Sequence, residues 1–485
     1  MADYILESKS GKWEVICGLE IHCQIISKSK IFSGASTNFG DDANQNVSFI
    51  DAGMPGMLPV LNKECVRQAV KTGLGLNAKI NKHSVFSRKN YFYADLPQGY
   101  QITQDKFPLV GEGKVSIDLS DGTTKEIGIE RIHIEQDAAK SIHDLDPKKS
   151  FIDFNRAGVG LMEIVTKPDF RSPEEVGAFL RKLRSIVRYL GTCDGNMDEG
   201  SMRCDASVSL RKVGETGFRP RAEVKNVNSV KFAVQAVEYE AKRQLEIYDR
   251  GETFEQASCH FDQTTGTTKF MRKKEYAHEY RQFPEPDLPP LILTDEYIEE
   301  VRKELVELPD EKKKRYVADL GLTAYDAMVI CENKEVADFF EIASQGRDAK
   351  KVANWLMGDF FAMLNKKNLD IKNSPVSADN LGKLVDLISK DVISGKIAKD
   401  VFEIMVETSE NPEDIVEKRG LKQVTDTSFI EAIVDEIIAN NPDNVANYKA
   451  GKTNLLGWFV GQVMKQSQGK ANPAMANKLI KDKLD

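Results

Sequence analysis

The sequence predicts an α+β protein, with an antiparallel sheet in residues 1–293, an all-helical domain in residues 294–408 and a small helical tail domain in residues 409–485. The chain has 485 residues, more than a single hydrophobic core usually spans, since about 150 residues per domain is typical. Up to residue 293, glycines, prolines and short alternating apolar runs are typical of strands joined by turns. Beyond that point Gly and Pro become sparse, and apolar residues recur at helical spacing.

Two proline-containing segments mark the expected domain boundaries. The run from Phe283 to Pro290 contains four prolines, which disfavour regular structure and keep the backbone extended. Asn411-Pro412 and the polar stretch that follows separate one set of amphipathic helices from a lysine-rich last set. One helix is expected inside the strand-rich part, because Ser172-Pro173 is a start signal and Gly191 a stop signal.

Composition excludes several classes of protein. Hydrophobic residues at 41% and charged residues at 29% indicate a soluble globular chain, neither disordered nor fibrous. No apolar stretch approaches the roughly 20 residues that a membrane helix needs, and the N-terminus lacks the apolar core of a secretory signal. We therefore expect a cytoplasmic protein with no membrane partner. The seven cysteines form no CxxC pair, which argues against a disulfide framework and a zinc finger.

The net charge of -8 means that any contact with nucleic acid must come from a local basic surface. One stretch qualifies: from Asn444 to the end of the chain, seven lysines stand against Asp482 and Asp485. Within it, Lys470 lies in a loop that begins with Gly469, where an ammonium and the backbone amides of the next helix could meet one phosphate. On composition alone, lysines that merely keep a helical bundle soluble are an equally good explanation.

Period-two alternation places titratable side chains on shared strand faces. From Glu14 to Gln24, apolar residues alternate onto one face and leave Glu20, His22 and Gln24 on the other. Alternation in four further runs also places polar side chains together on one strand face, or one carboxylate within an apolar strand. These residues are His133, Glu135 and Asp137; Glu163; Arg203 and Asp205; and Arg221, Glu223 and Lys225.

For any one of these strands taken alone, we favour a solvated sheet face with salt bridges. Several such faces together favour a metal-assisted phosphoryl-transfer site. Carboxylates with one imidazole and no thiolates suit Mg²⁺ or Mn²⁺ better than Zn²⁺, and the neighbouring Arg and Lys side chains suit phosphate. This interpretation requires that the strands lie side by side in one sheet.

Nine runs carry a more specific resemblance, and together they span nearly the whole chain. They are Gly18–Gln24, Lys89–Tyr93, Asp95–Gln104, Phe154–Glu163, Asp194–Asp205, Glu223–Ser229, Phe283–Pro290, Gly461–Lys465 and Gly469–Pro473. In this order they resemble the GatB family, the B subunits of the aspartyl/glutamyl-tRNA(Asn/Gln) amidotransferase.

The resemblance implies a cradle-shaped catalytic domain, followed by a helical domain and a tail domain. It implies two partner chains: an amidase that frees ammonia from glutamine, and a small third chain that forms a belt around the others. It also implies that this chain binds misacylated tRNA and uses ATP to phosphorylate the side-chain carboxyl of the attached Glu or Asp. Ammonia then displaces the phosphate, giving Gln-tRNA(Gln) or Asn-tRNA(Asn), so the chain would belong to a ligase.

Site residues follow from the same resemblance. Glu20, His22 and Glu135 match the Mg²⁺ ligands of the family, Glu163 is a further candidate ligand, and Asp205 and Glu223 are further catalytic candidates. Arg203, Lys225 and Asn226 are the candidate contacts to ATP, and Lys465, Lys470 and Asn472 are the candidate contacts to tRNA.

The sequence departs from the family pattern at a few positions. Some members carry a four-cysteine zinc knuckle where this chain has Ser33, Ala35, Ser48 and Asp51, so no zinc is expected. Gln98 stands where we expect a lysine, which puts in doubt any phosphate or tunnel role at that position.

Two other functions stay open at this point. The chain could be a non-catalytic tRNA-binding scaffold of the same complex, in which the acidic faces are structural. It could also be a free ATP-dependent ligase acting on a small carboxylate, although that leaves the lysine-rich tail without a role.

Overall fold

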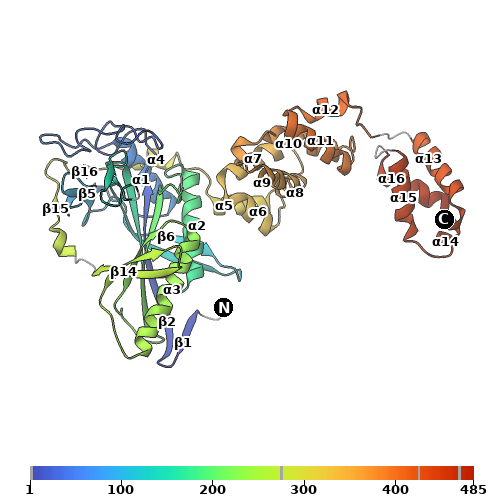
Figure 1. Ribbon diagram of the computed structural model, residues 1–485. Helices are drawn as coiled ribbons and strands as arrows, with labels where there is room; N and C mark the ends of the chain where they lie inside the picture. The colour runs from blue at the N-terminus through green and yellow to red at the C-terminus, as the bar shows by residue number, and fades with distance from the viewer. Residues whose placement is uncertain (1–3, 144, 274–276, 424–426, 468–470, 485) are drawn as a thin grey trace. The chain divides into compact units, whose positions relative to one another are not determined.

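The computed structural model describes residues 4–484 apart from 144, 274–276, 424–426 and 468–470. It divides into two compact units, Met1–Leu308 and Pro309–Asp485 (Figure 1). Every strand of the described chain lies in the first unit, and the second is helical. This confirms the predicted α+β class, while the domain boundaries at 293 and 409 stay predictions.

A nine-stranded sheet forms the centre of the first unit. Its strands run in the order β14-β13-β12-β11-β2-β10-β7-β6, and β1 pairs with the N-terminal end of β2. Neighbours are antiparallel except for the parallel pair β12 and β13. The bounds are β1 Ile5–Ser8, β2 Gly11–Gln24, β6 Gly113–Asp118, β7 Thr124–Gln136, β10 Gly160–Thr166, β11 Met202–Lys212, β12 Ala222–Val227, β13 Ala257–Asp262 and β14 Thr267–Lys273.

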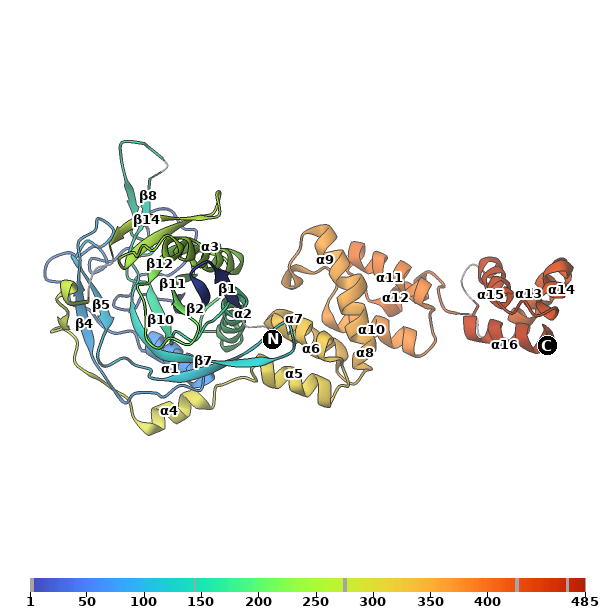
Figure 2. The same ribbon diagram turned by 90° about the horizontal axis from the view of Figure 1, so that it is seen from below.

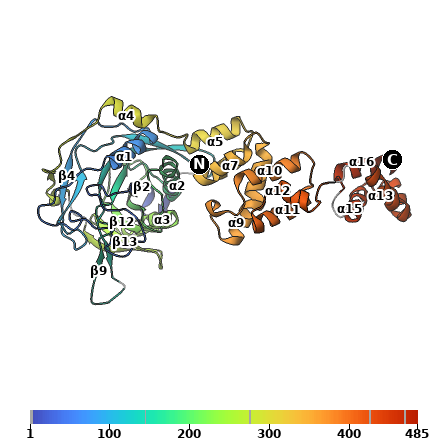
Figure 3. The ribbon, with the colours of Figure 1, turned by 90° about the horizontal axis from the view of Figure 1, so that it is seen from above.

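Helices cover the apolar face of this sheet. The alternate residues of β2 predicted to face inward, from Val15 to Cys23, are buried in one core with α1 (Lys63–Gly75), α2 (Pro173–Leu190) and α3 (Val230–Asp249). Figures 2 and 3 show α2 and α3 side by side against the sheet. The opposite face is left for polar side chains.

The helix predicted from its start and stop signals is α2. The Ser172 side chain accepts a hydrogen bond from the Glu175 backbone amide, and Pro173 occupies the first turn. Gly191 ends the helix at φ +69°, a left-handed conformation in which glycine has no Cβ penalty. The sequence signals for this helix are confirmed.

Short sheets edge the central one. They are β15 (Phe283–Pro284) with β4 (Phe86–Asn90) and β5 (Tyr100–Gln104); β16 (Leu291–Ile292) with β3 (His83–Ser84); and β8 (Lys140–Ile142) with β9 (Phe151–Asp153). β5 packs against β7. The proline-rich run is anchored by Glu285, which accepts two hydrogen bonds from the Arg88 guanidinium, at 2.7 and 2.9 Å. A short 3₁₀ turn, η1 (Ala277–Tyr280), precedes it, and α4 (Asp295–Arg302) packs on α1.

The second unit contains two groups of helices. In the first group, α12 packs on α10 and α11; in the second, α13, α15 and α16 surround a separate apolar core that includes Phe459 and Val463. The bounds are α5 Pro309–Ala318, α6 Ala324–Glu332, α7 Lys334–Ser344, α8 Ala349–Trp355, the π-turn η2 Leu356–Phe360, α9 Phe361–Lys367, the 3₁₀ turn η3 Ile371–Asn373, α10 Ala378–Ser389, α11 Gly395–Thr408, α12 Pro412–Lys418, α13 Thr427–Asn440, α14 Pro442–Lys449, α15 Leu455–Gln466 and α16 Pro473–Leu484. Among the described residues, none of the helices combines the length and hydropathy needed to span a bilayer.

A buried ion pair organises residues 25–62, a segment with neither helix nor strand. The Lys30 side chain is fully buried, and its Nζ donates to the Asn46 carbonyl at 2.6 Å, to Asp51 Oδ2 at 3.2 Å and to the Phe154 carbonyl at 3.3 Å. Ser33 donates its hydroxyl to the same carboxylate at 3.1 Å. The ion pair therefore connects several points of the segment to the edge of the sheet.

We expect Lys30→Met to lower the free energy of unfolding by about 3–5 kcal/mol, because it leaves the buried Asp51 carboxylate without its cation. Denaturant unfolding of the isolated chain measures this loss. Lys114→Met, which breaks an exposed pair with Glu126, is the matched control and should cost less than about 1 kcal/mol. Equal losses in the two variants would contradict a structural role for the buried pair.

Candidate functional site

The strands that carry the predicted polar faces are adjacent. Glu163 on β10 lies opposite His22 on β2 and opposite His133 on β7. On the other side of β2, Arg203 of β11 lies opposite His22, and Asp205 lies opposite Glu20. These strands therefore lie side by side in one sheet, as a phosphoryl-transfer site on this face requires.

Two imidazoles and two carboxylates form a compact cluster on this face. His22 Nε2 lies 3.2 Å from Glu163 Oε2, and His133 Nε2 lies 3.5 Å from the same oxygen and from Glu135 Oε2. Thr103, on β5, donates to Glu135 Oε2 at 2.7 Å. One ligand atom from each of His22, Glu135 and Glu163 can be chosen so that all lie within 4.8 Å of one another.

The electrostatics of the cluster favour a cation. Burial alone would lower the pKa of His133, yet the carboxylates of Glu163 and Glu135 raise that pKa to about 9. Burial would likewise raise the pKa of Glu163, but His133 and His22 hold it well below its ordinary value. Two ionised carboxylates buried together require positive charge, which protons on the imidazoles or a metal ion can supply.

The donor set fits a hard divalent ion. Two carboxylates and one imidazole without thiolate are ligands that Mg²⁺ and Mn²⁺ accept. His133 contacts both carboxylates through its Nε2, and its Nδ1 is buried and has no hydrogen-bond partner among the described residues. Of the four predicted ligands, the structure brings three together, while Glu20 lies two residues before His22 on the same strand face.

Arg203 and Lys225, the two cations predicted to contact ATP, are paired with carboxylates. Arg203 donates to both oxygens of Asp137, at 3.0 and 3.1 Å. Lys225 donates to Asp205 at 2.8 Å and lies 3.6 Å from Glu223. Although burial would lower the pKa of Lys225, Asp205 and Glu223 raise it, so the ammonium stays charged. The backbone of Asn226 lies in β12, but its side chain falls outside what the structure describes.

The predicted tRNA contacts lie in the last helices. Lys465 is exposed in the last turn of α15. Asn472 accepts hydrogen bonds from the amides of Ala474 and Met475 at 2.9 and 3.1 Å, so it caps α16. Lys470 falls outside the described residues.

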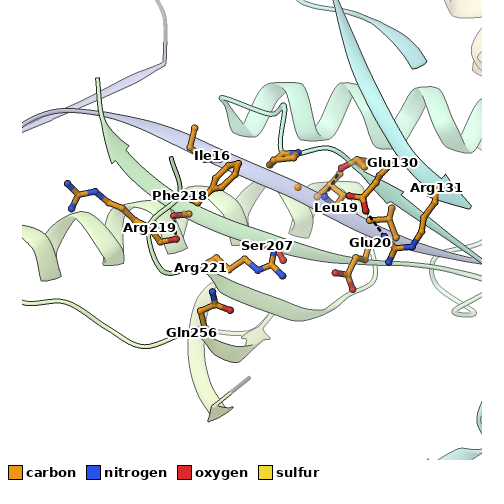
Figure 4. A pocket seen from close by; sticks show the side chains of 15 residues that line it. Ile16, Leu19, Glu20, Glu130, Arg131, Ser207, Phe218, Arg219, Arg221 and Gln256 are labelled. Carbon is orange, nitrogen blue, oxygen red and sulfur yellow. Dashed lines mark hydrogen bonds and ion pairs between the residues drawn. The ribbon is translucent and has the colours of Figure 1, made fainter. Parts of the chain in front are cut away.

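A pocket of about 550 Å³ opens on the same face of the sheet, beside Glu20 (Figure 4). Three arginines line it, from β7 and from the segment before β12: Arg131, Arg219 and Arg221. In Figure 4 the side chains of Arg131 and Arg221 lie on either side of Glu20. Arg221 is exposed and forms no ion pair within the described part of the chain.

Sequence reasoning missed Arg131 and Arg219. Arg131 could have been found, because it is two residues before His133 and shares its strand face. Arg219 lies outside any strand and is held by a paired hydrogen bond to Glu215 and by the rings of Trp13 and Tyr248, at 4.9 and 5.3 Å. Nothing in the local pattern signals that position.

Comparison with known proteins identifies the family. Residues 15–299 match the GatB/GatE catalytic domain, and residues 338–484 match the GatB domain. The chain belongs to the GatB family. It is 60% identical over 481 residues to the aspartyl/glutamyl-tRNA(Asn/Gln) amidotransferase B subunits of Paramagnetospirillum magneticum and of Rhodospirillum rubrum, covering 99% of each chain. The Gluconobacter oxydans protein of the same name is 55% identical over 478 residues, again covering 99% of each chain.

These matches confirm the resemblance stated from the motifs. They also confirm the prediction that this GatB-family chain works in a ligase of the tRNA-dependent amidotransferase class. The roles of individual site residues stay predictions, which the geometry above makes testable.

If the cluster holds a divalent ion, charge-removing substitutions should weaken its binding to the purified chain. Replacing a residue that hydrogen-bonds to a metal ligand lowers the affinity for the metal by about 10–100-fold. Replacing a ligand itself should lower that affinity at least as much. We expect Glu135→Gln and Glu163→Gln each to weaken Mn²⁺ binding by more than about tenfold, measured by titration with electron paramagnetic resonance. Glu126→Gln, on the exposed end of β7, should bind Mn²⁺ as the unmodified chain does.

Proposed function

We propose that the chain is the component that activates the side-chain carboxyl of Glu or Asp attached to tRNA, using ATP, before that carboxyl is amidated. The observation that carries the proposal is the cluster of buried Glu135 with half-buried His22 and Glu163, on the same sheet face as an arginine-lined pocket. A carboxylate is a poor nucleophile toward a polyphosphate unless both anions are clamped and neutralised. The cluster can hold the metal ion that neutralises the phosphates, and the arginine-lined pocket can clamp them.

The proposed roles follow from position. His22, Glu135 and Glu163 would hold Mg²⁺, which supplies neutralisation of phosphate charge during transfer. Arg221 would orient the ATP phosphates in the pocket beside Glu20, whereas Arg131 donates to Glu130 at 2.7 Å on the other side of the pocket. Asp205 accepts a hydrogen bond from the Lys225 ammonium at 2.8 Å and orients it on the same sheet face.

The reaction proceeds in two displacements. An oxygen of the substrate carboxylate attacks the γ-phosphorus, the bond to ADP breaks, and an acyl phosphate forms. Ammonia then attacks the carbonyl carbon, phosphate leaves, and one proton is lost to give the amide. The site has to exclude water between the steps, because water would hydrolyse the acyl phosphate.

The ammonia should come from another chain. All seven cysteines are buried in the core, and burial raises the pKa of Cys17 to about 12 and that of Cys259 to about 11. None is available as the thiolate nucleophile of a glutaminase. An amidase and a small third chain of the same complex are therefore the proposed partners, and the cytoplasm, where tRNA is charged, is the proposed location.

A non-catalytic tRNA scaffold is the alternative function. It would use the basic tail alone and leave the polar sheet face structural. What argues against it is the pocket beside the cluster, where Arg221 is exposed and makes no ion pair in the described part of the chain, because a purely structural face does not need an unpaired guanidinium.

In the reconstituted complex, Glu20→Gln and Glu135→Gln should each reduce ATP-dependent formation of amidated tRNA by about 10²–10³-fold, since each removes a carboxylate predicted to hold the Mg²⁺ that neutralises the phosphates. Glutaminase activity of the partner should persist, and Glu126→Gln should behave like the unmodified chain. Normal amidation by both site variants, with a normal dependence on Mg²⁺, would falsify the assignment of these residues to the metal site. The non-catalytic scaffold would then be the better explanation.

We also propose that the tail grips the body of the tRNA. Lys465, Lys478 and Lys481 are exposed and form no ion pair among the described residues, whereas Lys483 contacts Glu431 and Asp435. The three exposed lysines project from α15 and α16, and each phosphate contact they make would release condensed counterions.

Removing residues after Gln423 should therefore weaken tRNA binding and flatten its dependence on salt concentration. The cut is placed there because α12 packs on α10 and α11 and has to be kept. Filter binding between about 50 and 200 mM salt gives both affinity and slope. Glutaminase activity of the assembled complex is the control, and an unchanged salt slope would show that the tail makes no phosphate contacts.

A further inference from the structure

The pocket beside Glu20 follows strand β2, and its two ends differ in chemistry. Glu20 lines one end, and Ile16, on the same strand face, lines the other. Between them Gly18 lies opposite Ser207 of β11, so two of the smallest residues leave room above the sheet. The strand from Glu20 to Ile16 is about 14 Å long at the usual rise per residue. A ligand that fills this pocket is therefore long and has unlike ends.

The end away from Glu20 carries an exposed aromatic ring. Phe218 is 75% exposed, and its ring makes no aromatic or cation–π contact within the described part of the chain. Figure 4 shows it next to Ile16, which lines the same pocket. A flat ring at the edge of a pocket is a surface on which a planar ligand can stack.

The backbone that carries Phe218 is held on both sides of the ring. The Ser209 hydroxyl lies within hydrogen-bond distance of the carbonyls of Arg219 and Pro220, at 3.1 and 3.0 Å. On the other side, the Glu215 carboxylate accepts a hydrogen bond from the Arg219 guanidinium at 2.9 Å. This backbone is therefore ordered before a ligand binds, which lowers the entropy lost on binding.

A guanidinium lies between the two ends of the pocket. Arg221 is exposed and forms no ion pair with the residues that the structure describes. In Figure 4 its side chain extends from the Phe218 end of the pocket toward Ser207 and Glu20. The pocket thus offers a carboxylate, an available guanidinium and an exposed ring in that order. A metal-bound nucleotide presents a terminal phosphate, inner phosphates and a flat base in the same order.

We propose that Phe218 is the platform on which the base of ATP stacks. The proposal rests on the proposed function, which places the phosphates of ATP at Arg221, and it adds where the rest of the nucleotide lies. Every nucleobase has a π face, so stacking on Phe218 supplies affinity that the phosphates alone do not. Phe218 is a positioning residue: by holding the base near Ile16 it directs the terminal phosphate toward Glu20.

The test is nucleotide binding by the reconstituted complex, measured as the Kd for ADP and for pyrophosphate by isothermal titration calorimetry in Mg²⁺. Phe218→Ala should raise the Kd for ADP by about 5–100-fold, because the base loses its stacking partner. It should leave the Kd for pyrophosphate within about twofold, because pyrophosphate has no base. Phe218→Trp should bind ADP at least as tightly as the unmodified complex, since an indole also stacks. Phe429→Ala, at an exposed phenylalanine of α13, is the control and should change neither Kd.

Two outcomes would overturn the proposal. One is an unchanged Kd for ADP in Phe218→Ala; if tRNA affinity falls instead, the ring serves the 3′-terminal adenosine of the tRNA. The other is an equal loss for ADP and pyrophosphate, which would show that the ring acts on the phosphate site or on the fold of the pocket.

Arg221→Gln separates this test from that of the proposed function, because it should weaken ADP and pyrophosphate alike. If the unmodified complex binds neither compound, the proposed function fails. If Arg221→Gln weakens both compounds while Phe218→Ala weakens neither, only the stacking proposal fails.

Discussion

The site depends on the register of β10 between β2 and β7. Glu163 meets both His22 and His133 only because its strand pairs with both neighbours at that position. A slip of one residue would turn every one of these side chains to the opposite face. The register is held by the next residue, since Ile164 pairs with Ile21 and Ile132, and all three are completely buried. Burial of the isoleucines on one face of the sheet thus fixes the positions of the charged side chains on the opposite face.

This dependence explains what the sequence could predict. Alternation correctly divided β2, β7 and β11 into apolar and polar faces, because period two follows from strand geometry alone. The start and stop signals of α2 are equally local, and they too were sufficient. The family resemblance rested on runs of residues and needed no geometry. The ion-pair partners of these side chains could not be predicted: Arg203 and Lys225 stay predicted contacts to ATP, and the structure shows that they also donate to Asp137 and Asp205. Alternation reports which face a side chain occupies, whereas its partner is decided by strand order and by packing between sheets.

The cations of this face therefore divide into two kinds. Arg203, Lys225 and Arg131 are paired with carboxylates, and although burial would raise the pKa of Asp137, Arg203 helps to lower it. Arg221, exposed and without an ion pair in the described chain, has its charge available to a ligand. A protein with a net charge of -8 can attract a polyphosphate only through such a local field, which low-dielectric pocket walls strengthen.

Segment 25–62 contributes Ile31 and Phe32 to the hydrophobic core, and polar cross-links hold the rest of it. The Asp51 carboxylate accepts from the Ser33 hydroxyl, the Ser48 amide and the Lys30 ammonium. Ser33, Ser48 and Asp51 stand at three of the four positions where the family resemblance places metal-binding cysteines in some members, so a hydrogen-bonded carboxylate ties together the same points of the chain. Burial lowers the pKa of Lys30 and Asp51 opposes that shift, so the pair is stable only while both charges are kept together. The order of this segment therefore depends on one buried carboxylate and the three groups that donate to it.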